Sequence, residues 1–150
     1  LPHVETGRAV LEATDFAPFR ALRHAPAGMT AHIVYDDLDA VNPGSSSSIV
    51  VSDIIRDHIG FDGLLFSDDV CMKALQGPLG SRVSSVLGAG CDVALHCDGN
   101  LDDMVAIAET CPRMRPESMT RLNAARPSAA DSQSIDRDAA KRRISAFVSG

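Results

Sequence analysis

The sequence predicts an α/β fold in which parallel strands alternate with helices. Two observations predict it. Short apolar segments rich in β-branched residues are separated by stretches with helical spacing of apolar residues, and glycine or proline stands where the helical stretches end. Strands and helices that alternate in this way normally form a parallel sheet. The pattern is typical of both a doubly wound sheet and a barrel, so it leaves these two alternatives open.

The first part of the chain is expected to form a helix, a strand and a long loop. Apolar residues three apart predict a helix over residues 14–24, with Thr14 as its N-cap. Residues 29–35 are β-branched and aromatic, which predicts a buried strand. Residues 35–48 are polar and include four consecutive serines. A long loop after a buried strand is often functional, but a mobile linker would have a similar composition.

A second helix and a second strand are expected next. Isoleucines and valines on one face predict a helix over residues 49–59, which Gly60 would end. We expect Arg56 and His58 on the water-facing side of that helix. Residues 64–67 then predict a short buried strand that leads directly into two adjacent carboxylates.

The remainder of the chain repeats the alternation and then becomes helical. A helix is predicted over residues 81–89, a buried strand over 91–97 and a helix over 101–111. Residues 126–134 are small and polar, which predicts a flexible link, and residues 136–148 predict a final amphipathic helix.

Chemically useful side chains follow the three predicted strands. His32, the pair Asp68 and Asp69, and His96 with Asp98 all lie at or just past a strand's C-terminal end. In open parallel sheets and in barrels, that edge is where ligand and catalytic sites are built.

Composition excludes several classes of partner and site. The 150 residues carry a formal net charge of −6, and no basic cluster precedes the final KRR, which argues against nucleic acid and anionic membranes as partners. No apolar run approaches the roughly 20 residues of a membrane span, and we predict a cytoplasmic location. The four cysteines form no CxxC pair, so we expect reduced structural thiols, no metal site and no cofactor.

Five ordered motifs carry a resemblance to a known family. They are LPHV, DFAPFRAL, MTAHIVYDDLDAVNPGSSS, IIRDHIGFDGLLFSDDVCMKAL and AGCDVALHC. Together they resemble the later half of the catalytic (β/α)8 barrel of family-three glycoside hydrolases. Within that family they are most similar to the β-N-acetylhexosaminidases that remove N-acetylglucosamine from peptidoglycan recycling fragments. The resemblance implies a partial barrel over residues 1–125, followed by a linker and C-terminal helix over residues 126–150.

The FSDD motif is the most specific of the five, and the resemblance implies that Asp68 is the nucleophile of a retaining mechanism. Neighbouring side chains at a strand end point in different directions, so only one of the two carboxylates can readily face the barrel axis. We therefore expect Asp69 to support the site, as a strand-end carboxylate that binds backbone amides.

The other site residues each have two interpretations. His32 and Met72 are predicted to contact the sugar, although a hydrogen-bonded packing histidine and a core methionine are the alternatives. For His96 and Asp98, a structural role in capping the loop is favoured. Cys71 lies beside the site, but nothing around it requires a reactive thiol.

The resemblance also implies parts that this chain does not contain. In the relatives, a loop with an Asp and His acid/base dyad ends just before the LP motif, and a sugar-binding Lys and His pair lies earlier still. We therefore expect the isolated chain to be inactive, with a muropeptide or glycan containing N-acetylglucosamine as substrate of the whole protein. One alternative is a non-catalytic fragment or pseudoenzyme that associates through exposed half-barrel edges. Another is a metal-dependent hydrolase that uses Asp68, Asp69, His32 and His96.

Overall fold

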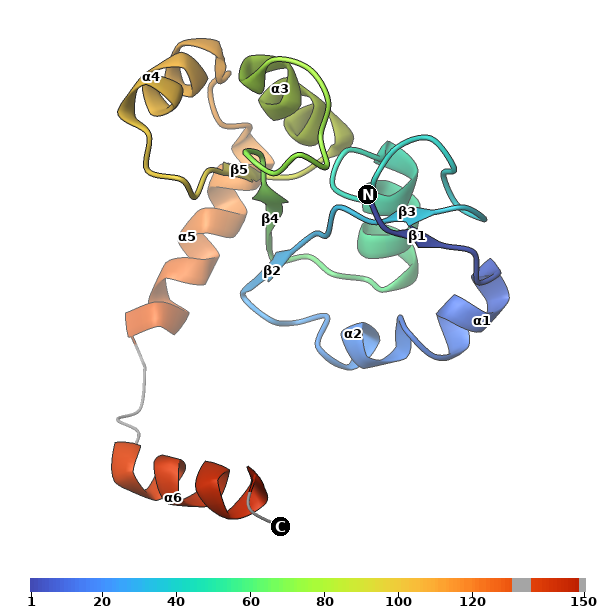
Figure 1. Ribbon diagram of the computed structural model, residues 1–150, viewed down its shortest axis with the longest axis vertical. Coiled ribbons are helices and arrows are strands. Elements are labelled where there is room, and N and C mark those ends of the chain that lie inside the picture. The colour runs from blue at the N-terminus through green and yellow to red at the C-terminus, as the bar shows by residue number, and fades with distance from the viewer. Residues whose placement is uncertain (131–135, 149–150) are drawn as a thin grey trace.

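The structure is a computed structural model that describes the backbone of residues 1–130 and 136–148. Five short strands alternate with helices in these residues (Figure 1). The strands are β1 (His3–Val4), β2 (Ala27–Met29), β3 (Val34–Tyr35), β4 (Leu64–Asp69) and β5 (Val93–Leu95). The helices are α1 (Arg8–Ala13), α2 (Ala17–Ala21), η1 (Ile49–His58), α3 (Leu79–Ala89), α4 (Leu101–Thr110), α5 (Pro116–Ala130) and α6 (Arg137–Val148).

The strands form two parallel sheets. In the first, β1 pairs with β3, and in the second, β4 lies between β2 and β5. Helices separate the paired strands in sequence, as parallel pairing requires. The α/β fold with parallel strands is therefore confirmed.

Two predicted elements near the N-terminus are wrong in their extent. Of the helix predicted over residues 14–24, only the shorter α2 is present. Thr14 does not start a helix but ends α1, and its hydroxyl donates to the Val10 carbonyl at 2.8 Å. A new helix starts beyond it because Pro18 stands in the first turn of α2, a position that proline favours. The strand predicted over residues 29–35 is split, because Met29 pairs with Phe66 of β4 whereas Val34 pairs with His3 of β1.

The elements from residue 49 to residue 111, and the final helix, are found close to their predicted positions. The helix predicted over residues 49–59 is present as η1, but it is wound as a π-helix, in which the Ile59 amide donates to the Ile54 carbonyl five residues back. Strands β4 and β5 and helices α3, α4 and α6 are also confirmed. Asn100 caps α4 by accepting hydrogen bonds from the amides of Asp102 and Asp103.

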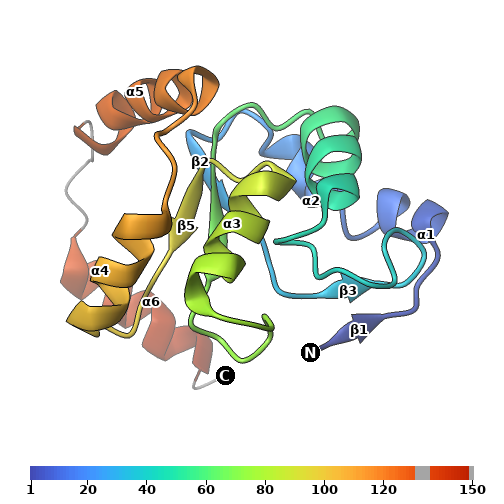
Figure 2. The same ribbon diagram turned by 90° about the horizontal axis from the view of Figure 1, so that it is seen from above.

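The apolar core lies between the second sheet and the helices η1 and α3 (Figure 2). Val51 and Ile54 of η1 pack with Leu65 of β4 and with the valines of α3, all of them buried. The chain turns tightly at Gly90, whose φ is +118° and whose missing side chain leaves room for Val51; a Cβ there would lie 2.8 Å from Val51 Cγ1.

A buried polar cluster joins the elements near the N-terminal end of β5. Asp92 accepts hydrogen bonds from Arg56 at 2.8 Å and Arg121 at 2.9 Å, and from the Leu65 amide at 2.9 Å. Ser118 of α5 donates to the same carboxylate. Burial opposes ionisation of Asp92, but these hydrogen bonds and the Arg121 charge outweigh it and lower its pKa. The prediction that Arg56 and His58 face water is wrong, because their side chains are only 15 % and 19 % exposed.

The C-terminal part differs from the predicted link. Helix α5 continues to Ala130, so residues 126–130 are helical, and residues 131–135 of the predicted link lie outside the described residues. Helix α6 lies apart from the rest of the chain in Figure 1, and Phe147 on it is 89 % exposed. Among the described helices, none combines the length and the apolar character needed to cross a membrane.

Candidate active site

The two adjacent carboxylates lie at the C-terminal end of β4, beside an irregularity in the sheet. Phe66 pairs with Val93 and Asp69 pairs with Leu95, so β4 carries one more residue than β5 between these pairs. Ser67 fills the resulting gap in the hydrogen bonding: its fully buried hydroxyl accepts from the Leu95 amide at 3.1 Å and donates to the Asp68 carbonyl at 2.7 Å. Bulges of this kind redirect side chains next to active sites. Nothing in the sequence around Ser67 indicates this role, because it depends on the pairing of β4 with β5.

Asp68 and Asp69 differ in what their carboxylates bind. The Asp69 Oδ1 atom accepts from the amides of Cys71 at 3.0 Å and Cys97 at 3.2 Å. Among the described residues, the Asp68 carboxylate accepts one hydrogen bond, from the Asp69 amide to Oδ1 at 2.8 Å. Asp68 thus has carboxylate capacity left for a ligand, while Asp69 connects two loops.

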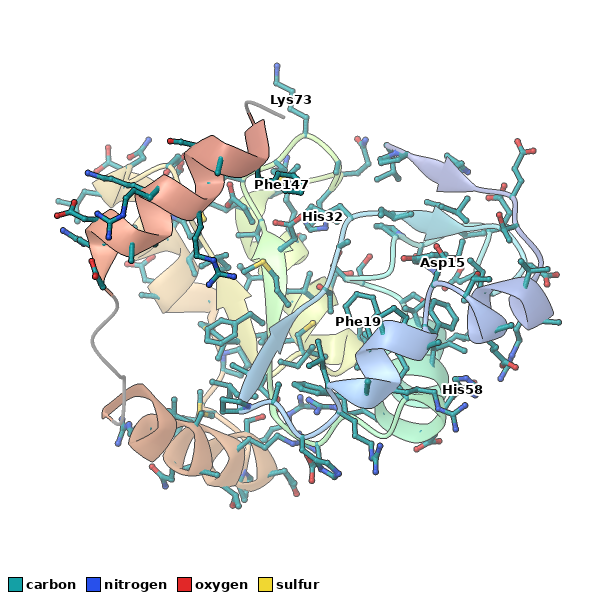
Figure 3. All side chains as sticks on the ribbon, turned by 90° about the horizontal axis from the view of Figure 1, so that it is seen from below. Asp15, Phe19, His32, His58, Lys73 and Phe147 are labelled. Atoms are coloured by element: carbon teal, nitrogen blue, oxygen red, sulfur yellow. The ribbon has the colours of Figure 1, made fainter. Side chains whose placement is uncertain are left out.

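His32 is buried beside these carboxylates and hydrogen-bonded at both ring nitrogens. Its Nε2 lies 2.9 Å from the Asp69 carbonyl oxygen, which can only accept, so Nε2–H is the donor. Its Nδ1 lies 2.5 Å from the Ser45 hydroxyl, which donates to it when the ring is neutral. Figure 3 shows His32 near the middle of the molecule. His32 is therefore buried against the C-terminal end of β4, and both of its ring nitrogens are hydrogen-bonded to other residues of the chain.

The serine-rich segment is packed against the rest of the chain and held by hydrogen bonds. Ser45 and Ser47 are buried, and the Ser47 hydroxyl donates to Asp39 Oδ2 at 2.7 Å. Asp39 also accepts from the Val41 and Asn42 amides. Burial raises the pKa of Asp39, but the hydrogen bonds from Asn42, Ser47 and Val41 outweigh it and lower the pKa to about 2. The alternative that this segment is a mobile linker is wrong. Patterns local in sequence did not reveal the contacts of Asp39 and Ser45.

Met72 and the residues after β5 lie in loops at the same edge. Met72 is 45 % exposed, and its amide donates to the Asp69 carbonyl at 3.1 Å. Asp98 accepts from the Asn100 amide, as expected of a residue that caps the loop. Burial and the nearby carboxylates of Asp69 and Asp98 raise the pKa of Cys71 to about 11, which agrees with the expectation of an unreactive thiol.

The metal-dependent alternative requires Asp68, Asp69, His32 and His96 to come together around one ion. Among the described residues, these four do not form a group of potential ligands. Both ring nitrogens of His32 are bound to protein, so it has none left for a metal. In the described part of the chain, the residues that come together as potential ligands are Cys71, His96 and Asp98.

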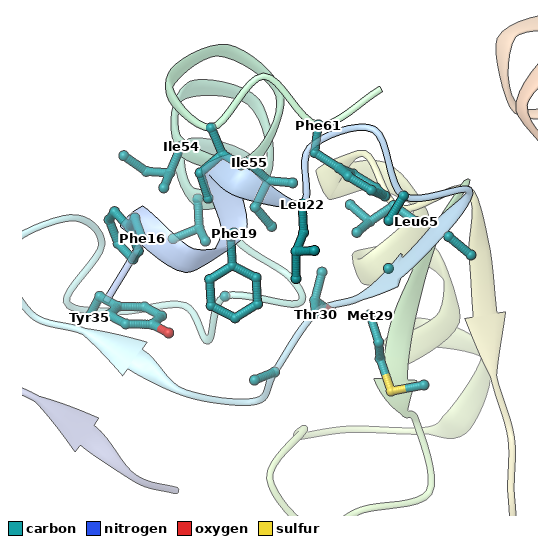
Figure 4. A pocket seen from close by; sticks show the side chains of 17 residues that line it. Phe16, Phe19, Leu22, Met29, Thr30, Tyr35, Ile54, Ile55, Phe61 and Leu65 are labelled. Carbon is teal, nitrogen blue, oxygen red and sulfur yellow. The ribbon is translucent and has the colours of Figure 1, made fainter. Parts of the chain in front are cut away.

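An apolar cavity of about 300 Å³ lies away from the carboxylates, between α2, β2 and η1 (Figure 4). Phe16, Phe19, Leu22 and Met29 line it, and three of them are more than half exposed on the surface. Asp68 is not among its lining residues. Among the described residues, its lining is almost wholly apolar and offers no carboxylate or imidazole that could do chemistry, so we assign the candidate site to the carboxylates.

Comparison with known proteins identifies the family. Residues 1–126 match the glycosyl hydrolase family 3 N-terminal domain. The chain belongs to glycosyl hydrolase family 3.

Curated members of family 3 similar to the chain are named beta-hexosaminidase. The protein of Alkalilimnicola ehrlichii is 35 % identical over 126 residues, which cover 81 % of this chain and 36 % of the relative. That of Aromatoleum aromaticum is 36 % identical over 144 residues, which cover 91 % of this chain and 40 % of the relative. The chain therefore spans well under half the length of these relatives.

Solved structures of family 3 proteins are also similar to the chain. A β-N-acetylglucosaminidase from Paenibacillus sp. aligns with a TM-score of 0.73 at 25 % identity, covering 90 % of this chain and 28 % of that protein. NagZ from Neisseria gonorrhoeae, solved with N-trifluoroacetyl-D-glucosamine, aligns with a TM-score of 0.71 at 31 % identity, covering 83 % of this chain and 37 % of NagZ. These alignments agree with the α/β fold and the partial barrel implied by the resemblance.

Proposed function

We propose that this chain is the nucleophile-bearing part of a β-N-acetylhexosaminidase that removes terminal β-N-acetylglucosamine from peptidoglycan fragments with retention of configuration. The proposal rests on the carboxylate of Asp68, which lies at the C-terminal end of β4 and can accept further hydrogen bonds or a ligand. The names of the curated relatives and of the solved structures support the class of substrate.

In this mechanism Asp68 attacks the anomeric carbon of the sugar. The bond from the carboxylate oxygen to that carbon forms while the bond to the leaving oxygen breaks, and a general acid protonates the leaving group. Water then attacks the glycosyl-enzyme, gives its proton to the same group acting as base, and releases Asp68. The chemistry requires a carboxylate oxygen that is free to attack, which favours Asp68, with one amide donor, over Asp69, whose carboxylate accepts from two amides in different loops.

The neighbouring residues have supporting roles in the proposal. Asp69 fixes the loops after β4 and β5 through the amides of Cys71 and Cys97. His32 acts as a positioning residue, because it fixes the backbone of Asp69 while its ring is buried. Met72 is exposed in the loop that follows the nucleophile and would contact the sugar there.

The proton donor in this proposal comes from chain preceding Leu1 in the whole protein, as the family resemblance implies. The proposal also includes a cytoplasmic location and a domain boundary at residue 125, between the partial barrel and the C-terminal segment. Self-association is the second candidate function, favoured by the exposure of Phe19, Leu22 and Met29 at 57 to 64 %.

The experiment compares hydrolysis of a chromogenic N-acetyl-β-glucosaminide by this chain and by a version extended upstream through the acid/base loop. We expect turnover in the extended protein and little or none in the 150-residue chain. Folded but inactive protein in both forms would overturn the proposal and favour the pseudoenzyme. Light scattering on the same samples measures whether the chain associates.

A further inference from the structure

Three potential metal ligands from two loops meet beside the carboxylate of Asp69. They are Cys71 in the loop after β4, and His96 and Asp98 in the loop after β5. One ligand atom of each lies within 4.8 Å of the other two. Cys71 is separated in sequence from the other two by α3 and β5, so the fold itself brings it to His96 and Asp98.

In this cluster, the side chain of His96 has a buried nitrogen that lacks a hydrogen bond within the described part of the chain. Its side chain is only 10 % exposed, and among the described residues Nε2 has no hydrogen-bond partner. Asp98 Oδ1 lies 2.9 Å from Nε2, but the pair does not have the angles of a hydrogen bond. A buried polar atom without a partner is costly and rare in folded proteins. An ion bound by both groups would satisfy this nitrogen.

The two loops that carry the ligands are already connected. Asp69 Oδ1 accepts from the amide of Cys71 itself and from the amide of Cys97, which stands between His96 and Asp98. The ligands are therefore preorganised by a residue that need not bind the ion, in the manner of the hydrogen bonds that orient metal ligands in known sites.

We propose that Cys71, His96 and Asp98 bind a zinc ion. One thiolate, one imidazole and one carboxylate form a donor set that suits Zn²⁺, and three protein ligands leave a fourth position for water. The Cys71 thiol binds as the thiolate and releases one proton to solvent as the metal–sulfur bond forms. The predicted catalytic carboxylate, Asp68, is not part of this set.

The bound ion would fix the loops after β4 and β5 to each other, next to the Asp69 carboxylate that already joins them. Because it binds the folded state, it would also raise the stability of the chain in proportion to its affinity. This proposal departs from the sequence-based expectation of no metal site. It does not depend on the proposed glycosidase activity, since its ligands and its readouts are independent of turnover.

The test is a titration of the metal-free, reduced chain with Co²⁺ as a spectroscopic substitute for Zn²⁺. We expect one equivalent to bind with a thiolate-to-cobalt charge-transfer band and with the visible absorption of a four-coordinate ion, and Zn²⁺ to displace it. In Cys71→Ser the charge-transfer band should be lost and the affinity should fall at least about tenfold. Cys97→Ser and Cys111→Ser are matched controls that should keep both.

Thermal unfolding with and without Zn²⁺ provides a second readout. Zn²⁺ should raise the Tm of the unmodified chain and of Cys111→Ser, but not that of His96→Gln. Circular dichroism confirms that each variant is folded. An unmodified chain that gives no thiolate-to-cobalt band and no Tm increase overturns the proposal. So does a band that Cys97→Ser abolishes and Cys71→Ser retains.

Discussion

The imidazole of His32 is hydrogen-bonded to the backbone of Asp69, 37 residues later in the chain, at 2.9 Å. Through its other nitrogen the same ring contacts Ser45 in the serine-rich loop. One buried side chain thus joins the loop before η1 to the end of β4. The position of the Asp68–Asp69 pair therefore depends on a side chain that is itself buried.

Removing His32 should reduce stability. In His32→Ala the Ser45 hydroxyl and the Asp69 carbonyl lose their buried partner, and each such loss costs about 1–3 kcal/mol. Urea unfolding should show a decrease of that order in the free energy of unfolding. His24→Ala is the matched control, because His24 is exposed and should change stability little. Equal stabilities of the two variants would contradict the role given to His32.

Asp68 and Asp69 should respond differently to substitution in the upstream-extended protein. Asp68→Ala removes the proposed nucleophile and should lower kcat at least about a thousandfold. Asp69→Asn keeps an oxygen that can accept from the Cys71 and Cys97 amides, so measurable turnover should remain. Hydrolysis of a chromogenic substrate measures both, and an equal loss in the two variants would refute the assignment.

Loss of the Asp92 charge should destabilise the fold strongly. Asp92→Asn leaves the guanidinium groups of Arg56 and Arg121 without their buried counter-ion, and breaking such a cluster costs about 3–5 kcal/mol. Denaturant unfolding measures this cost, with Asp53→Asn, at an exposed position, as the control. A decrease no larger than that of the control would show that the cluster contributes little.

Asp39 should titrate well below an ordinary aspartate. Its pKa in the folded chain is about 2, against an ordinary value of 3.8, so its ionised form stabilises the fold. That contribution is complete above pH 3.8 and is lost as the pH falls through about 2. NMR titration of the side-chain carboxyl carbon measures the pKa directly. Ser47→Ala removes one of the donors and should raise it; a pKa near 3.8 in the unmodified chain would contradict this explanation.

The position of the candidate site could be predicted because it depends on patterns that are local in sequence. The apolar run before Asp68 identifies the end of a strand, and Asn100 before two acidic residues is typical of a helix start. The predicted helix and strand boundaries from residue 49 to residue 111 lie close to the observed ones for the same reason. Asp69 accepts hydrogen bonds from backbone amides, as expected of a carboxylate at a strand end, while the role of Asp68 as nucleophile stays a prediction.

Several of the missed features depend on contacts between distant residues. Arg56 has the spacing of an exposed helical residue, and only the fold brings it to Asp92, 36 residues later. The bulge at Ser67 depends on the register between β4 and β5, which neither strand's sequence specifies. Likewise, the cluster of Cys71, His96 and Asp98 exists only once the two loops are side by side.

The most direct test of the central claim is covalent trapping of the nucleophile in the upstream-extended protein. A mechanism-based fluorinated N-acetylglucosaminide slows the release of the glycosyl-enzyme, and peptide mass spectrometry then locates the sugar. We predict one sugar per chain, attached to Asp68. Attachment to Asp69 or to any other residue of this chain would contradict the proposed mechanism.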